Sequence, residues 1–191
     1  MTFRRAGEML LAIVLLLLAA MVLCGLFGAL HDQISFTVSP EYYTRFKFVM
    51  FGHLPFGPDR LSVANVGFLA TWWMGVPIGA TLGTIGLFAP DARTMLRETL
   101  RAFVLVAIVA LAFSLGGLLA GIATFRGPSP VFPPDWYLPA GPPLRDPAAF
   151  LRAGSMHNAA YLGGAIGTLI AAIRLAGRVS ALRRSARGGT R

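Results

Sequence analysis

Three histidines and two acidic residues have the side chains best suited to chemistry in this sequence. They are His31, Asp32, Glu41, His53 and His157. Imidazole nitrogens and carboxylate oxygens together are a donor set for zinc, copper or iron. Their spacing matches no established metal-binding motif. A metal site is therefore predicted only if the fold brings these five residues together.

Two other interpretations of these residues stay open. They could form a polar network that fastens connecting segments to helix ends, or they could contact a partner protein or a small ligand. Asp32 and Glu41 also have basic neighbours in Arg45 and Lys47. An ordinary helical pair between Glu41 and Arg45 would explain those charges without any function.

Four long apolar segments must position these residues. The chain has 191 residues, of which 55% are hydrophobic and only 13% charged, and charge-free runs of about 18 or more apolar residues are typical of membrane-spanning helices. We predict an all-α fold: one integral membrane domain over residues 1–191, built as a four-helix bundle. Its helices are expected at about 9–30, 63–89, 102–124 and 157–176. The first run is too long for the apolar core of a signal peptide, and we interpret it as a retained anchor.

The distribution of Lys and Arg predicts the orientation of these helices. With both termini in the cytoplasm, 11 basic residues fall on the cytoplasmic side and 6 on the outer side, as the positive-inside rule favours. The net charge of +9 then indicates attraction of the arginine-rich tail, 177–191, to anionic lipids. It gives no reason to expect nucleic-acid binding.

Under this topology the three histidines lie on the outer side. His31 ends the first helix and His157 begins the fourth, so the two could approach each other at the outer rim of the bundle.

The connections between the spans carry recognisable helix starts. Ser39, Pro40 and Glu41 predict the start of an interfacial helix at about 40–51, rich in aromatic residues. A proline-rich outer loop is expected at 126–147. Asp91 is expected to cap the third helix.

The approach to the fourth helix is expected to contain a short separate helix. Asp146 and Pro147 predict its start, and Gly154 its end. Ser155 would then cap the fourth helix.

The second helix has unusual residues inside its apolar run. Pro77 predicts a kink, and the small residues around it, such as Gly75, favour close helix packing. A ligand or ion passage at the kink is the alternative. Trp72 and Trp73 are expected to pack in the core, or else to face a groove for a lipid, quinone or pigment.

One segment resembles a known group of proteins. The sequence HDQISFTVSPEYYTRFKF, residues 31–48, is similar to a segment of small uncharacterised bacterial four-helix membrane proteins, and residues 157–164 fit the same pattern. The likeness covers about 30 residues. It implies a bacterial inner membrane and brings no activity with it.

Motifs of the familiar soluble enzymes, such as a phosphate-binding glycine loop or a nucleophile elbow, do not occur in the sequence. We therefore expect a non-enzymatic accessory protein or complex subunit whose outer face binds a partner, a lipid or a small ligand. The alternatives are a membrane metalloprotein or enzyme with its site at the outer rim, and a small oligomeric transporter or channel. Expected partners are the lipid bilayer and either another membrane protein or further copies of the chain.

Overall fold

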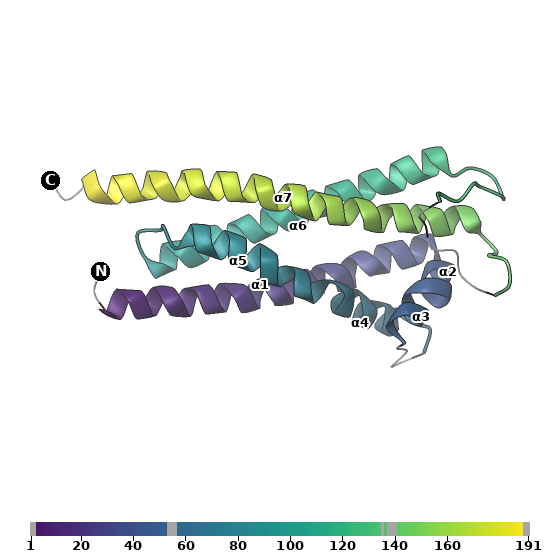
Figure 1. Cartoon of the computed structure of the whole chain (residues 1–191), viewed down its shortest axis with the longest axis horizontal. Coiled ribbons are helices and arrows are strands. Elements are labelled where there is room, and N and C mark those ends of the chain that lie inside the picture. Colours follow the sequence, from purple (N-terminus) through teal and green to yellow (C-terminus); the bar gives the residue numbers. More distant parts are fainter. Residues whose placement is uncertain (1–2, 53–56, 135, 137–140, 189–191) are drawn as a thin grey trace. The chain divides into compact units, whose positions relative to one another are not determined.

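The fold is an all-α helical bundle (Figure 1). The computed structural model describes residues 3–52, 57–134, 136 and 141–188, and no β-strand occurs within those ranges. The elements in chain order are α1 (Phe3–Val38), α2 (Pro40–Tyr42), a π-helical turn η1 (Tyr43–Lys47), α3 (Phe48–Phe51), α4 (Arg60–Thr71), a 3-10 turn η2 (Trp72–Met74), α5 (Gly75–Gly86), α6 (Ala92–Thr124) and α7 (Pro147–Gly188).

Four stretches of helix are long and apolar enough to cross a membrane. They are Arg5–Val38, Arg60–Gly86, Ala92–Thr124 and Pro147–Ala186. Each of these stretches includes all or most of the residues of one predicted span. We therefore treat the chain as an integral membrane protein.

Several predicted helix starts are confirmed. The hydroxyl of Ser39 accepts a hydrogen bond from the amide of Tyr42, and the carboxylate of Asp91 accepts one from Thr94 at 2.8 Å. Asp146 accepts one from Ala149 at 2.9 Å. In each case a polar side chain accepts a hydrogen bond from an amide in the first turn of its helix, as an N-cap residue does.

The predicted break at Gly154 is wrong, because α7 runs without interruption from Pro147 to Gly188. Gly154 lies against the ring of Trp136, where an added Cβ would collide with the indole. The hydroxyl of Ser155 donates to the carbonyl of Leu151 within the helix and caps nothing. This glycine therefore serves the packing of the proline-rich connection against α7, and most of the predicted tail continues the same helix.

The second span is interrupted one turn before Pro77. Proline lacks an amide hydrogen, and its ring clashes with the carbonyl four residues earlier, that of Trp73. The chain forms the 3-10 turn η2 at this point, and the amide of Gly75 hydrogen-bonds to the carbonyls of Trp72 and Trp73. The expectation that both tryptophans pack in the core is wrong, since 38% of Trp72 and 54% of Trp73 are exposed.

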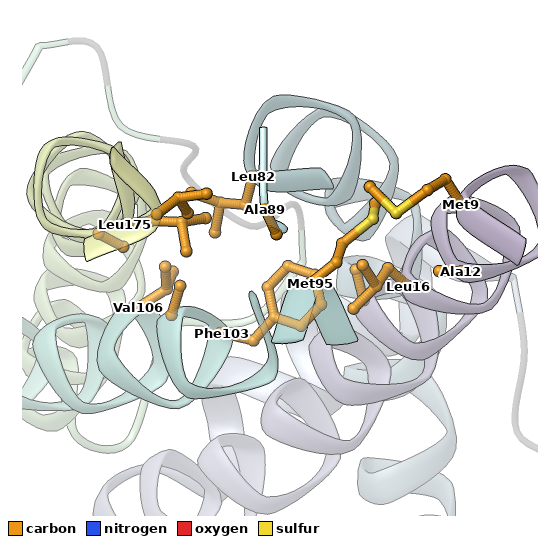
Figure 2. Packing of buried hydrophobic residues seen from close by; sticks show 13 residues of the cluster. Met9, Ala12, Leu16, Leu82, Ala89, Met95, Phe103, Val106 and Leu175 are labelled. Atoms are coloured by element: carbon orange, nitrogen blue, oxygen red, sulfur yellow. The ribbon is translucent and has the colours of Figure 1, made fainter. Parts of the chain in front are cut away.

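The helices divide into two compact units. Unit 1 contains residues 1–25, 71–109 and 164–191, which include both chain termini and the short link between α5 and α6. Its core is apolar: Figure 2 shows Met9 and Leu16 from α1, Met95 and Phe103 from α6, and Leu82 from α5 converging on one another. Helix α5 lies close to α1 because Gly75 faces the backbone of Met21.

Unit 2 contains residues 26–70 and 110–163, and so it includes both long connections. Its core is more aromatic, with buried members Tyr42, Tyr43, Phe48, Val63, Val66, Phe150 and Ala153. The predicted interfacial helix is present as α2, η1 and α3, but one face of it is buried in this core. In Figure 1 these short elements lie beside the starts of α4 and α7.

Candidate metal centre

The C-terminal part of α1 and the N-terminal part of α7 bring three predicted residues together in unit 2. The Nδ1 atom of His31 lies 3.1 Å from Oδ1 of Asp32, and Nε2 of His157 lies 3.8 Å from the same oxygen. One ligand atom from each residue falls within 4.8 Å of the other two. All three side chains are almost fully buried, so they form an enclosed His-Asp-His cluster.

A buried lysine from η1 joins this cluster. The Nζ atom of Lys47 lies 3.5 Å from Oδ2 of Asp32, and Lys47 is only 3% exposed. An isolated charge in an apolar interior is strongly unfavourable. The ammonium and the carboxylate therefore stabilise each other, and the pair adds no net charge to the unit.

Two hydroxyl groups connect the cluster to the backbone of α1. Tyr43 donates from its hydroxyl to the carbonyl of Asp32 at 3.1 Å, and that hydroxyl lies 2.5 Å from Oγ of Ser35. Ser35 Oγ in turn lies 3.1 Å from Nε2 of His157. Burial, reinforced by the negative charge of Asp32, raises the pKa of Tyr43. This phenol therefore stays a neutral hydrogen-bonding group.

The second ring nitrogen of His31 has a partner on α6. Its Nε2 lies 2.8 Å from Oγ of Ser114, a fully buried hydroxyl. The ionised carboxylate of Asp32 can only accept, so Nδ1 of His31 carries the proton and Nε2 accepts from Ser114. A hydroxyl can also accept a hydrogen bond, so Ser114 could support the opposite tautomer if Nδ1 bound a cation.

Aromatic rings cover both imidazoles. Phe27 stacks on His31 with ring centroids 5.8 Å apart, and Tyr42 stacks on His157 at 5.0 Å with an interplanar angle of 16°. These contacts restrict the rotation of both histidine rings. They also strengthen the electrostatic interactions in the cluster, because apolar groups replace water around it.

Glu41, a fourth predicted ligand, has other partners. The carboxylate of Glu41 accepts hydrogen bonds from the backbone amides of Arg145 at 3.0 Å and Asp146 at 2.9 Å. It therefore fastens the end of the proline-rich connection to the start of α2. His53 lies outside the described residues. Among the described residues, the structure thus brings together His31, Asp32 and His157, and it separates Glu41 from them by its bonds to the backbone of residues 145–146.

Four residues that contact the His-Asp-His cluster were not predicted as site residues. They differ in how far the sequence could have indicated them. Tyr43 and Lys47 are four residues apart in an aromatic helix, which places them on one face together with buried ring positions. Ser35 lies four residues after His31 and shares its face of α1. Ser114 is an isolated hydroxyl in a long apolar helix, and nothing in its local sequence connects it with His31.

The geometry of the three ligands suits a transition-metal ion. Donor atoms in a tetrahedral site with bonds of about 2.0–2.2 Å lie roughly 3.3 Å apart, close to the 3.1 Å and 3.8 Å measured to Asp32 Oδ1. Ser114 lies on the other nitrogen of His31, as the outer partner of a metal-binding histidine commonly does. Lys47 opposes binding, because its positive charge already neutralises Asp32.

The chain was also compared with known proteins. No protein-family model, curated protein or solved structure gave a significant match. The function is therefore inferred from the arrangement of the side chains.

Proposed function

We propose that this is an integral membrane protein that binds one divalent transition-metal ion through His31, Asp32 and His157. The observation that carries the proposal is the mutual approach of these three ligand atoms inside a buried cluster. Two imidazoles and one carboxylate are a donor set for zinc and for non-haem iron, and they are also compatible with copper. Three protein ligands leave one coordination position of a tetrahedral ion for a small ligand or water.

We place the protein in a bacterial inner membrane with both termini in the cytoplasm. The resemblance of residues 31–48 supports the type of membrane. The positions of Lys and Arg in the sequence support the orientation, because 11 of these basic residues fall on the side of the two termini and the other 6 on the opposite side of the predicted spans. Lys47 is one of those 6, and it is buried against Asp32. A green fluorescent protein fused after Arg191 should fluoresce in cells, whereas a dark, correctly inserted fusion would reverse this orientation.

The metal content of the purified protein tests the proposal directly. The full chain is purified in mild detergent without chelator, and its metals are quantified by mass spectrometry before and after dialysis against micromolar zinc. We expect about one ion per chain in the unmodified protein, loss of the ion in His31→Ala and His157→Ala, and retention in Asn158→Ala. Asn158 is a matched control because it adjoins His157 on α7 and is exposed.

A second candidate function follows from the ion pair between Asp32 and Lys47. The pair carries no net charge, and the cluster ties η1 to α1 and α7. In this second reading the protein is a non-enzymatic accessory subunit, and the cluster is a structural network that shapes an outer face for a partner. A well-folded protein that takes up no zinc, copper or iron would reject the metal proposal and favour this one.

A further inference from the structure

Unit 1 contains a second charged cluster, built around Glu98 of α6. Its Oε1 atom accepts hydrogen bonds from Nε of Arg97 and from a terminal nitrogen of Arg101, both at 3.0 Å. Its Oε2 atom accepts from Nε of Arg178 of α7 at 2.7 Å. One carboxylate thus holds three guanidinium groups from two helices.

The burial pattern shows that these arginines point outward. The side chain of Glu98 is 2% exposed, whereas those of Arg97, Arg101 and Arg178 are 54%, 63% and 59% exposed. The carboxylate is therefore buried, while the three arginine side chains that bond to it are exposed. Each guanidinium has five N–H donors, and Glu98 accepts one from each.

The cluster has unbalanced charge and fixed geometry. Three guanidinium groups and one carboxylate give a net charge of about +2 at neutral pH. Arg97 and Arg178 bond to Glu98 through Nε, so four of the five N–H donors of each guanidinium are not used in that bond. Guanidinium groups held in this way match the oxygens of a phosphate group.

The position along the helices places this charge at the depth of lipid headgroups. Arg101 immediately precedes the apolar run that begins at Ala102, and Arg178 lies one turn beyond Arg174, which ends the apolar run of α7. Arginines at the ends of membrane spans lie next to the phosphates of the adjacent leaflet. The nearest abundant ligand of the required charge is therefore an anionic phospholipid.

We propose that Arg97, Arg101 and Arg178, held in place by Glu98, form a binding site for the phosphate group of an anionic phospholipid. This site is independent of the metal proposed for unit 2. It also differs from diffuse attraction of lipid by the basic end of α7, because it requires one buried carboxylate and a defined set of donors.

Native mass spectrometry of the full chain in detergent tests this assignment. The protein is titrated with cardiolipin, phosphatidylglycerol and phosphatidylcholine in separate experiments. We expect both anionic lipids to bind more tightly than phosphatidylcholine, and the double variant Arg97→Gln/Arg178→Gln to lose about tenfold in affinity for them. The control Arg183→Gln/Arg184→Gln removes the same charge from exposed positions farther along α7 and should lose much less.

Glu98→Gln separates a built site from simple charge attraction. It raises the net charge by one, so attraction alone predicts tighter binding of anionic lipid. The proposed site predicts weaker binding, because the three arginines lose their common acceptor. If this variant does not fold, the comparison between the two double arginine variants tests the proposal. All four of those arginine side chains are exposed, so we expect both double variants to fold.

Three outcomes would overturn the proposal: equal losses in the two arginine pairs, tighter lipid binding by folded Glu98→Gln, or equal affinity for phosphatidylcholine. A further arm adds inorganic phosphate alone at millimolar concentration. Inorganic phosphate that binds at least as tightly as the anionic lipids would assign the site to a free anion and reject the lipid.

Discussion

Lys47 Nζ lies 3.5 Å from Asp32 Oδ2, and both side chains are at least 96% buried. The two residues come from different elements, η1 and α1, so their pairing fixes the short helical segment against the long helix. Neither charge would be stable alone in this environment. Removing one partner of this pair is therefore expected to destabilise unit 2.

Replacing Lys47 with methionine should destabilise the protein by about 3 kcal/mol, because the carboxylate of Asp32 stays buried without its partner. The double variant Asp32→Asn/Lys47→Met should lose less, since it leaves no unpaired charge. Thermal unfolding in detergent measures both. Under the metal proposal, zinc should restore part of the stability of Lys47→Met by supplying positive charge. A single variant no less stable than the double variant would contradict the importance of the ion pair.

Tyr43→Phe should cost about 2 kcal/mol, because it removes a hydroxyl that serves both Ser35 and the carbonyl of Asp32 and leaves buried polar atoms without a partner. The neighbouring substitution Tyr42→Phe is the matched control. It keeps the ring that stacks on His157 and should cost less. Chemical or thermal unfolding of the two variants under the same detergent conditions compares them, and equal losses would argue against the hydrogen-bonded role of Tyr43.

Stability should fall in alkaline solution because of the same tyrosines. Burial raises the pKa of both Tyr42 and Tyr43 above the ordinary value of about 10. Below that value both residues are protonated in the folded and unfolded chains, so their contribution is fully present. As the pH rises above it, only the unfolded chain releases the protons, and folding is disfavoured. Melting temperatures from pH 8 to 11.5 should therefore decline less steeply for Tyr43→Phe than for the unmodified protein, and parallel curves would contradict this assignment.

Two adjacent glycines of α7 should respond in opposite ways to alanine. A Cβ added to Gly163 would lie 2.5 Å from the Cβ of Phe113 and 3.0 Å from the Cα of Ala110, whereas one added to Gly164 meets no atom within 4 Å. Gly163→Ala should cost about 2 kcal/mol through overpacking. Gly164→Ala should be neutral or stabilise the helix by up to about 1 kcal/mol. The difference between their melting temperatures tests the helix contact, and a tolerated Gly163→Ala would show that α6 and α7 are less closely packed there.

The sequence by itself determined the helical class, the four apolar spans and most helix starts. These features depend on residues close together in the chain: the length of an apolar run, or a side chain such as Asp91 that caps an amide three residues later. Local sequence was insufficient at Gly154, where a ring from a distant connection explains the glycine. It was also insufficient at Trp72 and Trp73, where hydropathy alone did not show which side of the helix faces the core.

Tertiary structure alone decided the composition of the candidate site. The sequence allowed His31 and His157 to approach each other, but their contact depends on the rotation of α1 and α7, which many packing interactions fix together. The same packing placed Lys47 beside Asp32, Ser114 beside His31, and Glu41 on the backbone of residues 145–146. The residue types thus show which donor groups the chain contains. Which of these side chains contact one another depends on the rotation and packing of the helices.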